Sequence, residues 1–588
     1  MQTQRGIPVS PGVAVARAFV FDAGDRPIPR RQVPSAETPA QIQRLETALG
    51  AAAEEVEAIR DRTRARLGDE LARIFDFHLG MLRDPALRDR VRGPVESENV
   101  TAEYAVHATF RALAESFEAH EEPFFRERAS DLDDLRRRVL KHLVDQPRST
   151  LAALDRPGIV VAHDLTPSQT AALDRRHVKA LAIDAGGKTS HTAILAHALG
   201  IPAVVGLGDL AERVTTGETI IIDGDRGEAI VAPDAATLLE YRGAARRSKE
   251  QARSLLESRQ LPAETRDGAT IEILGNIEFP SEIDEALAMG AMGVGLYRTE
   301  YLFLASHHAP TEQEQYDAYA DAIRRLDGKP LTIRTIDLGA DKMPEGVPGL
   351  FRDERNPFLG CRSIRLCLQH LDLFKTQLRA VLRASTLGPV RVMFPLISNM
   401  MELRQSRMVL QDVMEDLDDA GVAFDHDLQV GMMIEVPSAA LQAEAFAKEV
   451  DFFSIGTNDL IQYTVAVDRG NERIASLYSG AHPAVVRLVR EVVRAADRAG
   501  VSVSLCGEMA GDREFTMLLL GLGLRSLSVT PPAIPSVKQV VRSVSLAQCQ
   551  RLARRAGAVD SPREAHTLLR EEVDRVVPRH SAGRTAGR

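Results

Sequence analysis

Polar residues follow several short apolar runs in the second half of the chain, and their types suit the binding of an anion. Arg298 ends the run GVGLYR, and Arg334 ends the run LTIR. A guanidinium offers a planar fork of N–H donors that fits carboxylate and phosphate oxygens. Either arginine alone reads equally well as a surface residue, but their corresponding positions at the ends of two runs favour a role in binding.

Two carboxylates follow neighbouring runs further along the chain. Glu435 follows GMMI, while Asn458 and Asp459 follow DFFSIGT. Carboxylates from neighbouring strand ends suit Mg²⁺, a hard ion that keeps several waters and takes its remaining oxygens from the substrate. An isolated strand-end carboxylate is more often a helix N-cap, so it is the pairing that favours metal. Downstream, Arg469 is placed to reach a substrate carboxylate or phosphate, and Arg362 is a further candidate.

The cysteines form no CxxC pair and show no metal-ligand spacing with histidine, which fits a reducing, cytoplasmic compartment. Cys506 stands at the end of the run VSVSL. Burial as a structural thiol is the default reading of a cysteine. A thiol pKa of about 8.5 also makes it a reasonable proton donor near neutrality. The four cysteines are Cys361, Cys367, Cys506 and Cys549.

A second kind of chemistry is indicated by the segment DAGGKTSHTAILAHALG. Two glycines and a Thr-Ser pair lead into an apolar helix that ends at Gly200, with His191 in the first turn. Free N–H groups and the positive end of the helix dipole lie where a phosphoryl group on that imidazole would be held. A nucleotide-binding Walker A loop is excluded, because its first glycine would fall at Ala182. A lone histidine near a helix cap would need no function.

Length and composition set the frame for these motifs. A chain of 588 residues is too long for one core, and three or four domains are expected. A formal charge of -10 and the absence of tryptophan argue against a nucleic-acid surface. No apolar run approaches a spanning helix, and the start MQTQRGIPVSPG lacks the apolar region of a signal peptide.

The pattern of apolar and polar residues changes along the chain. Residues 8–22 read as strands, whereas 37–143 show apolar residues at three and four spacing and predict a bundle of long helices. Residues 157–233 read as a compact α/β unit. The charged segment 239–260 reads as a helical connector with few tertiary contacts.

Eight apolar runs alternate with helical segments beyond Thr265, which predicts a (β/α)8 barrel. A doubly wound sheet would have the same count. The polar residues at successive run ends favour the barrel, because barrel enzymes assemble their sites at that rim. The runs are ATIEILGN, GVGLYRTE, LTIRTIDLG, VRVMFPLI, GMMIEVPS, DFFSIGTND, VSVSLCGE and RSLSVTP.

The whole His191 segment resembles the phosphohistidine motif of the phosphoenolpyruvate-utilising enzymes, which include enzyme I of the sugar phosphotransferase system. The resemblance to enzyme I runs in order from GIPVSPG through the helical region and the barrel to about Leu569. It implies a phosphotransferase that moves the phosphoryl group of phosphoenolpyruvate to its own His191 and then to the phosphocarrier protein HPr, releasing pyruvate. By the same match, Thr166 in DLTPS hydrogen-bonds the imidazole, although a turn-forming Thr before Pro167 needs no function.

The resemblance also assigns roles to the barrel residues. It implies that Cys506 protonates the enolate left by phosphoryl transfer and that the barrel domain dimerises. HPr is expected to bind the helical region, where RIFDFHLGMLRDPAL and ENVTAEYAVHATF carry a looser match. The implied ligands of phosphoenolpyruvate are Arg298, Arg334, Asn458, Asp459 and Arg469, and those of Mg²⁺ are Glu435 and Asp459.

Two related activities fit less well. Pyruvate phosphate dikinase and phosphoenolpyruvate synthase carry a large nucleotide-binding domain ahead of the same motifs, and the nitrogen-branch enzyme I carries a sensory domain. Only about 150 residues precede the His191 unit here, so neither is expected. A regulatory phosphocarrier without a substrate site is the alternative from another class, and the set from Arg298 to Cys506 speaks against it.

The expected architecture is multidomain α/β: a helical bundle inserted before a swivelling α/β phosphohistidine domain, then a (β/α)8 barrel. Because the same imidazole must react with a metabolite and with a protein, the His191 domain is expected to move between two binding positions. The expected divisions are N-terminal strands 1–33 packing with the phosphohistidine domain, the helical HPr-binding domain 34–148, the phosphohistidine domain 149–235, a helical linker 236–262, the phosphoenolpyruvate-binding barrel and dimerisation domain 263–575, and a disordered tail 576–588.

Overall fold

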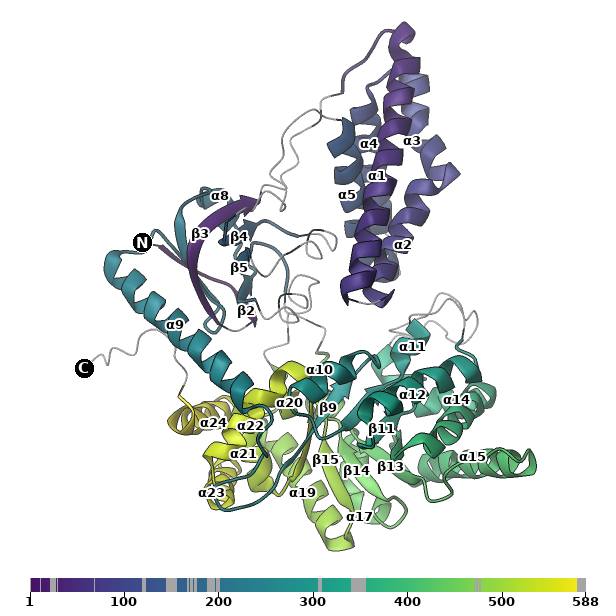
Figure 1. The fold of residues 1–588 in the computed structure, drawn as a ribbon, viewed down its shortest axis with the longest axis vertical. Helices are drawn as coiled ribbons and strands as arrows, with labels where there is room; N and C mark the ends of the chain where they lie inside the picture. The colour runs from purple at the N-terminus through teal and green to yellow at the C-terminus, as the bar shows by residue number, and fades with distance from the viewer. Residues whose placement is uncertain are drawn as a thin grey trace. The chain divides into compact units, whose positions relative to one another are not determined.

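The fold was analysed in a computed structural model, in which the chain divides after Gln251 into two compact units (Figure 1). Among the described residues, no helix is long and apolar enough to cross a membrane. The structure describes residues 2–10, 12–21, 28, 30–67, 69–118, 123–143, 156–165, 169, 173, 177–187, 196, 201–304, 309–339, 356–469, 471, 474 and 477–578.

A helical bundle forms one part of the first unit, as the three and four spacing predicts. Helix α1 packs against α2 and α5, and α4 packs against α3 and α5 (Figure 1). Leu45, Leu49, Val91, Phe110 and Leu132 lie in its common core. The helices are α1 (Thr38–Leu67), α2 (Asp69–Arg83), α3 (Pro85–Glu98), α4 (Ala102–Glu118) and α5 (Pro123–Leu143), preceded by the 3₁₀ turn Ser35–Glu37.

An eight-stranded mixed sheet forms the other part of this unit, in the order β1-β8-β7-β3-β4-β5-β6-β2. Strand β3 pairs parallel with β4 and antiparallel with β7, so the N-terminal strands share a sheet with the segment around residues 158–231. The strands are β1 (Gln2–Arg5), β2 (Ile7–Ser10), β3 (Val13–Phe21), β4 (Gly158–Ala162), β5 (Val178–Ile183), β6 (Ala203–Val205), β7 (Thr219–Asp223) and β8 (Glu228–Val231).

One short stretch connects the two edges of this sheet. Strand β1 pairs with β8, and β2 pairs with β6 at the opposite edge. Only Gly6 separates β1 from β2, and a Cβ atom there would lie 2.4 Å from the carbonyl oxygen of Val205. A side chain at residue 6 would therefore push the N-terminal strand off the sheet.

The charged helix α9 (Ala235–Ser258) makes more contacts than its polarity suggests. Tyr241 and Ala244 are buried in one cluster with Val13, Ile221 and Ile230 of the sheet. The first half of α9 thus packs on the sheet, since its few apolar residues recur on one face. This differs from the expectation of a connector with few tertiary contacts.

The second unit contains a closed barrel of eight parallel strands, in the order β9 to β16, with β16 pairing back to β9. The prediction of a (β/α)8 barrel over a doubly wound sheet is confirmed, and every predicted run supplies a strand. The strands are β9 (Glu272–Ile277), β10 (Val294–Arg298), β11 (Leu331–Arg334), β12 (Val390–Phe394), β13 (Gln429–Ile434), β14 (Phe452–Ile455), β15 (Ser502–Leu505) and β16 (Ser526–Val529).

Helices surround the barrel and carry its main apolar layer (Figure 1). Several begin at side-chain caps that the sequence encodes, such as the reciprocal bonds of Thr311 with Glu314 and of Asn399 with Glu402. Short 3₁₀ turns span Pro357–Leu359, Ser385–Leu387 and Pro531–Ala533. Helix α8 (Leu210–Arg213) belongs to the first unit. The described helices of the second unit are α10 (Glu282–Ala288), α11 (Glu300–Leu304), α12 (Glu312–Leu326), α13 (Ile364–Gln369), α14 (Leu371–Ala384), α15 (Met400–Asp419), α16 (Pro437–Leu441), α17 (Ala443–Phe446), α18 (Thr457–Val465), α19 (Pro483–Ala499), α20 (Glu508–Gly511), α21 (Arg513–Leu522), α22 (Ile534–Ser543), α23 (Leu546–Ala556) and α24 (Pro562–Val576).

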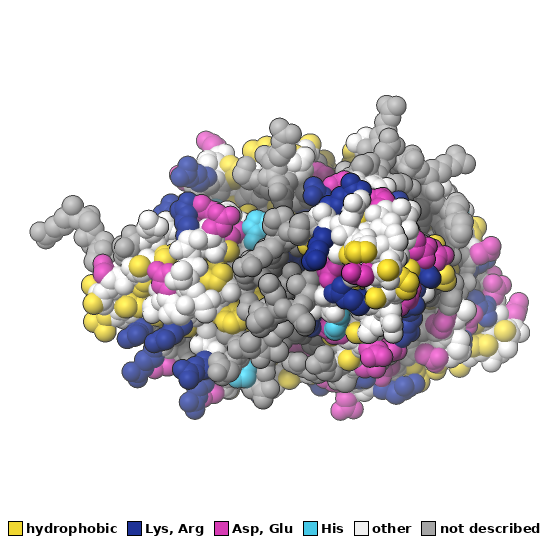
Figure 2. Space-filling view, turned by 90° about the horizontal axis from the view of Figure 1, so that it is seen from above, with side chains coloured by type: hydrophobic (Ala, Val, Ile, Leu, Met, Phe, Trp, Pro, Cys, Tyr) yellow, Lys and Arg dark blue, Asp and Glu magenta, His cyan; other side chains and the backbone are white. Residues whose placement is uncertain are grey.

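Charged side chains of both signs are interspersed on the molecular face drawn in Figure 2. Among the coloured residues of that face, Lys and Arg do not merge into one extended basic surface. Binding to a nucleic-acid backbone needs clustered positive charge.

The segment just after Ala252 is fastened to the barrel by a buried lysine. The Lys538 ammonium donates to the carbonyl oxygens of Arg259 and Gly290, and Gln260 donates to Leu287 and Ala288. A buried ammonium that loses a carbonyl partner is destabilised by about 1–3 kcal/mol. The residues directly after α9 therefore belong to the fold of the second unit.

We predict that a fragment of residues 252–579 folds alone and is more stable than a fragment of 262–579 by about 1–3 kcal/mol. Urea unfolding followed by circular dichroism measures the difference. As a matched control, Lys538→Met should lower the stability of the longer fragment and change the shorter one much less. Equal unfolding midpoints for the two fragments would contradict the assignment.

Candidate active site

The register of neighbouring strands in the barrel places the polar residues at the strand ends in two groups. Arg298 of β10 and Arg334 of β11 are direct register partners. Ile434, Ile455 and Leu505 are partners across β13, β14 and β15. The residues that follow these three, Glu435, Gly456 and Cys506, therefore lie at a common level next to the barrel's carboxyl-terminal rim.

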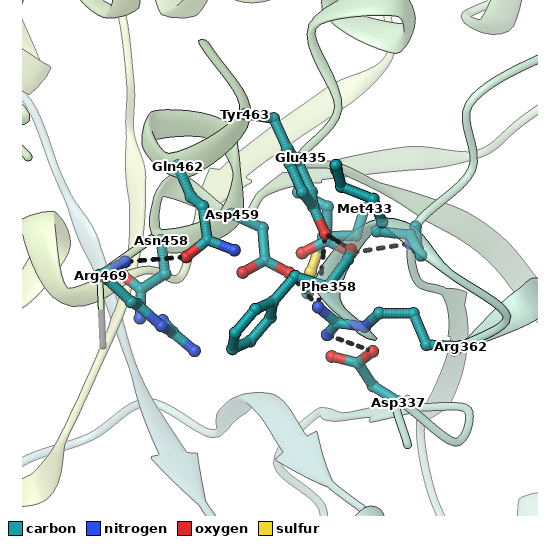
Figure 3. Close-up of polar contacts among 12 residues, drawn as sticks. Asp337, Phe358, Arg362, Met433, Glu435, Asn458, Asp459, Gln462, Tyr463 and Arg469 are labelled. Atoms are coloured by element: carbon teal, nitrogen blue, oxygen red, sulfur yellow. Dashed lines mark hydrogen bonds and ion pairs between the residues drawn. The ribbon is translucent and has the colours of Figure 1, made fainter. Parts of the chain in front are cut away.

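A chain of buried ion pairs runs across this rim. Arg334 pairs with Glu300 and lies 3.0 Å from an oxygen of Asp337. The other Asp337 oxygen lies 2.8 Å from Arg362, whose second terminal nitrogen is 3.4 Å from Asp459. Figure 3 shows Arg362 between Asp337 and Asp459. All five side chains are less than 10% exposed, so each charge depends on the others for compensation.

These ion pairs determine the charge of both arginines. Burial alone would lower the pKa of each guanidinium. Glu300 and Asp337 around Arg334, and Asp337 and Asp459 around Arg362, instead hold both pKa values above the ordinary value. Both arginines thus remain cationic and fixed in place, as a preformed site for an anion requires.

Glu435 is a buried carboxyl with an unusual environment. Its Oε1 atom accepts a 2.7 Å hydrogen bond from the backbone N–H of Leu396. Burial, followed by the charges of Asp459 and Asp337, raises the pKa of Glu435 to about 8. A carboxyl group that faces other carboxylates in a dry site favours either a proton or a metal cation.

The pair Glu435 and Asp459 fits a partly hydrated Mg²⁺ ion better than a site built from protein ligands alone. Among the described residues, no group of three or more His, Cys, Asp or Glu side chains is arranged to hold a metal. Mg²⁺ commonly uses one or two carboxylates, with waters and substrate oxygens completing its shell. The charge of Asp459 helps to raise the pKa of Glu435, and a divalent cation bound by the two carboxylates would offset this repulsion.

Cys506 lies at the inner end of the rim, inside the barrel. Its Sγ atom is 3.7 Å from the carbonyl oxygen of Ile455, and its backbone carbonyl accepts from Asn276 at 3.0 Å. Burial raises the pKa of the thiol, so it remains protonated at neutral pH. Its apolar neighbours in the barrel interior are Leu296, Met393, Met433 and Phe452.

The remaining predicted residues stand at the edge of the rim. Arg298 donates a 2.9 Å hydrogen bond to Glu278. The Asn458 side chain accepts from the backbone N–H of Glu508 at 2.9 Å and donates to its carboxylate at 3.1 Å. Arg469 is exposed; its backbone N–H donates a 3.1 Å hydrogen bond to the Gln462 side chain, and its own side chain hydrogen-bonds Tyr478. Figure 3 shows Arg469 beside Asn458, away from Arg362.

Unsatisfied polar atoms gather in the same region. Buried polar atoms without a hydrogen-bond partner are rare in folded proteins, and several here belong to residues at or just after the ends of β10, β11 and β14. These atoms have hydrogen-bonding capacity left for substrate, water or an ion. They are Glu300 Oε2, Arg334 Nε, Thr335 Oγ1, Arg362 Nε, Ser363 Oγ and Thr457 Oγ1.

Two residues of the predicted phosphohistidine segment are not among those described. His191 and Thr166 both lie outside the described residues, as does the tail from residue 579. One part of the His191 motif is described. Asp184 accepts hydrogen bonds from the backbone of Leu210 and Ala211 at 2.7 and 2.9 Å, so the first residue of the motif has a structural role as a helix cap.

Two residues of the ion-pair chain were not singled out in the sequence. Glu300 contacts Arg334, and Asp337 contacts both Arg334 and Arg362; the two carboxylates stand two and three residues after the ends of β10 and β11. That position was a usable signal, since Glu300 stands in YRTE and Asp337 in RTIDLG. Arg362, named in the sequence only as a further candidate, lies between Asp337 and Asp459 in the chain of charges.

Comparison with known families covers most of the chain. Residues 252–546 match the family described as PEP-utilising enzyme, PEP-binding domain. Residues 5–128 match the PEP-utilising enzyme N-terminal family, and residues 154–227 match the mobile domain of PEP-utilising enzymes.

Individual relatives are similar over nearly the same length. The phosphoenolpyruvate-protein phosphotransferase of Geobacillus stearothermophilus is 42% identical, with 94% of this chain and 95% of the relative covered. The protein of the same name from Bacillus subtilis (strain 168) is 39% identical, with 97% and 100% covered. A solution structure titled Enzyme I (nEIt) is 35% identical and covers 42% of this chain and 99% of its own, with a TM-score of 0.38.

We predict that Gly456→Ala disrupts the carboxylate pair without unfolding the barrel. A Cβ atom at residue 456 would lie 2.7 Å from Glu435 Oε2 and 2.9 Å from Met433 Sδ, so the Glu435 carboxylate must move. Calorimetric titration with Mg²⁺ should show affinity weakened by about tenfold or more, which corresponds to about 1.4 kcal/mol. Gly80→Ala, on an open helix face, is the matched control and should bind as wild type. Unchanged Mg²⁺ affinity in Gly456→Ala would exclude Glu435 as a ligand.

Proposed function

The chain belongs to the family of PEP-utilising enzymes, and on that premise we propose that it is a phosphoenolpyruvate-protein phosphotransferase. It takes the phosphoryl group of phosphoenolpyruvate onto His191, releases pyruvate and passes the group to the phosphocarrier protein HPr, the first step of the sugar phosphotransferase system. The observation that carries this proposal is the 42% identity to a protein of that name over 94% of the chain. The buried charges at the barrel rim supply a matching site.

Phosphoenolpyruvate presents a carboxylate and a phosphate, so its site must compensate several negative charges at once. We assign this role to Arg298, Arg334 and Arg469. Asn458 would add hydrogen bonds, and Asp459 would contact the substrate through the Mg²⁺ ion. Arg334 is already fixed by its carboxylate partners, so substrate binding does not have to order it. A site that is rigid before binding loses less entropy in the reaction step.

Glu435 and Asp459 would hold a Mg²⁺ ion, which when bound stabilises negative charge on the transferring phosphoryl oxygens. The role of this chain's own residues is then to orient the phosphate for in-line attack by the neutral His191 imidazole. The bond between phosphorus and the enol oxygen breaks as the bond to nitrogen forms. The electron pair remains on the departing enolate.

Cys506 completes the formation of pyruvate. The enolate must gain a proton on carbon, and a buried thiol with a raised pKa still carries that proton at neutral pH. Its place at the inner end of the rim, next to apolar side chains, keeps competing water away from the carbanionic carbon.

The second half-reaction requires a protein acceptor. We propose that HPr binds the helical bundle, that the His191 domain moves between HPr and the barrel, and that the barrel domain dimerises. Support for the movement comes from the match of residues 154–227 to a family described as a mobile domain. The cytoplasmic location, expected from the absence of a spanning run and of a signal-peptide region and in keeping with the cysteine pattern, stays a prediction.

We predict that His191→Gln abolishes autophosphorylation by phosphoenolpyruvate and leaves magnesium-dependent substrate binding intact. The reason is that the barrel ligands lie in a different unit from residue 191. Acid-labile phosphate on the protein, measured after incubation with labelled phosphoenolpyruvate, is the readout, and calorimetry is the binding control. Persistent acid-labile label on the variant would disprove His191 as the carrier. A wild-type protein that takes label only from phosphorylated HPr would instead identify a carrier without a substrate site.

We predict that Cys506→Ala slows one half-reaction and leaves the other intact. Phosphoryl transfer from phosphorylated HPr to His191 should continue, because the thiol acts only on the pyruvate side. Turnover of phosphoenolpyruvate should fall by at least about 10²-fold, the usual contribution of a positioned acid. Pyruvate release followed by a coupled assay measures this rate. Unchanged turnover would make Cys506 a packing residue of the barrel interior.

A further inference from the structure

A chain of buried polar side chains lies behind the arginine-bearing strand ends, and the proposed mechanism does not use it. Gln377 of α14, Tyr319 and Gln315 of α12, and Thr299 after β10 are all completely buried. They connect the outer helices to the barrel across the apolar layer formed by residues such as Leu378. Polar groups in such a place must satisfy one another.

Gln377 is the central member and makes three hydrogen bonds. Its Oε1 atom accepts from the backbone N–H of Ile336 at 2.9 Å, and its Nε2 atom donates to Thr299 Oγ1 at 3.0 Å and to the Tyr319 hydroxyl at 3.1 Å. A backbone N–H can only donate, so the orientation of the amide is determined. Neither donor of this side chain is left unused.

The direction of every other bond in the chain agrees with this orientation. Thr299 donates to the carbonyl oxygen of Arg334 at 2.8 Å. Tyr319 donates to Gln315 at 3.2 Å, and Gln315 donates to the carbonyl oxygen of Pro310 at 3.0 Å. Since each hydroxyl accepts one bond and donates one, a single arrangement satisfies all the members.

Two of the hydrogen-bond partners of Gln377, Thr299 and the backbone of Ile336, are next in sequence to charged residues of the rim. Thr299 stands between Arg298 and Glu300, and Ile336 precedes Asp337. The amide therefore ties the loop after β10 to the loop after β11, at the level where their guanidinium and carboxylate groups begin. A set of buried polar groups gives little net stability over an apolar replacement of the same volume, but it fixes geometry that apolar contacts leave adjustable.

We infer that Gln377 is a positioning residue for the phosphoenolpyruvate site: through Thr299 and the Ile336 backbone it sets the spacing of Arg298 and Arg334. The inference rests on the proposed function. Gln377 does not touch substrate in this account, and Tyr319 serves to orient the Gln377 amide.

The test compares variants of the full-length protein in both half-reactions. In Gln377→Leu the volume is nearly kept and all three bonds are lost. We expect kcat/KM for phosphoenolpyruvate to fall by about 10²-fold, the effect of a small misplacement of binding groups. Phosphoryl exchange between phosphorylated HPr and His191 should stay at the wild-type rate. Tyr319→Phe, which keeps the bonds to Thr299 and Ile336, should lose less.

Leu378→Ala is the matched control, because it alters the adjacent buried residue of α14 without touching a hydrogen bond. It should lower the thermal midpoint at least as much as Gln377→Leu and keep wild-type kcat/KM. If Gln377→Leu does not fold, Thr299→Val, which removes the hydroxyl at nearly constant volume, carries the same expectation. A wild-type kcat/KM in Gln377→Leu or in Thr299→Val would overturn the inference. A loss of kcat/KM in Leu378→Ala as large as that in Gln377→Leu would overturn it too. A wild-type protein inert toward phosphoenolpyruvate would overturn the proposed function as well.

Discussion

The compensation of buried charge at the barrel rim is the constraint on which the rest of the site depends. Arg334 and Arg362 are both withdrawn from water, and Asp337 contacts both of them. Removing one member would leave an uncompensated buried charge, a loss of about 3–5 kcal/mol. The strand ends must therefore keep the spacing that lets these groups meet. The loops after β10 and β11, and the first turn of α18, are held by this requirement as much as by apolar packing.

The same arrangement explains why the site is suited to an anionic substrate with a cation. The arginines stay charged because carboxylates surround them, while Glu435, surrounded by carboxylates in turn, has its pKa raised to about 8. The rim thus holds two fixed guanidinium groups among carboxylates, and an acidic group, Glu435, that a proton or a divalent ion must neutralise. Preorganised charge of this kind favours a transition state in which phosphoryl oxygens gain negative charge. The buried thiol of Cys506 lies at the level of Glu435 beside apolar side chains, and burial keeps it protonated.

Much of this organisation could be read from the sequence. The eight runs that alternate with helical segments predicted the barrel, and the polar residues at their ends predicted which rim carries the site. What the runs could not show is register. Whether Arg298 lies beside Arg334, and Glu435 level with Cys506, depends on how each strand is shifted against its neighbour. Asp337 was missed for a related reason: a charged residue after a strand is common, and only its two arginine contacts distinguish it.

The sequence by itself determined the fold class, the family and the chemical types available, because hydrophobic periodicity and local motifs are properties of neighbouring residues. The tertiary structure decided which charges share a site. Arg362, only a further candidate in the sequence, joins Asp337 to Asp459 in the buried chain of charges. Gln377, a residue of an amphipathic helix that the sequence did not single out, links two strand ends. The helix α9 also packed on the sheet despite its polar sequence. Contacts between residues far apart in the chain follow from barrel closure and burial, which no local pattern encodes.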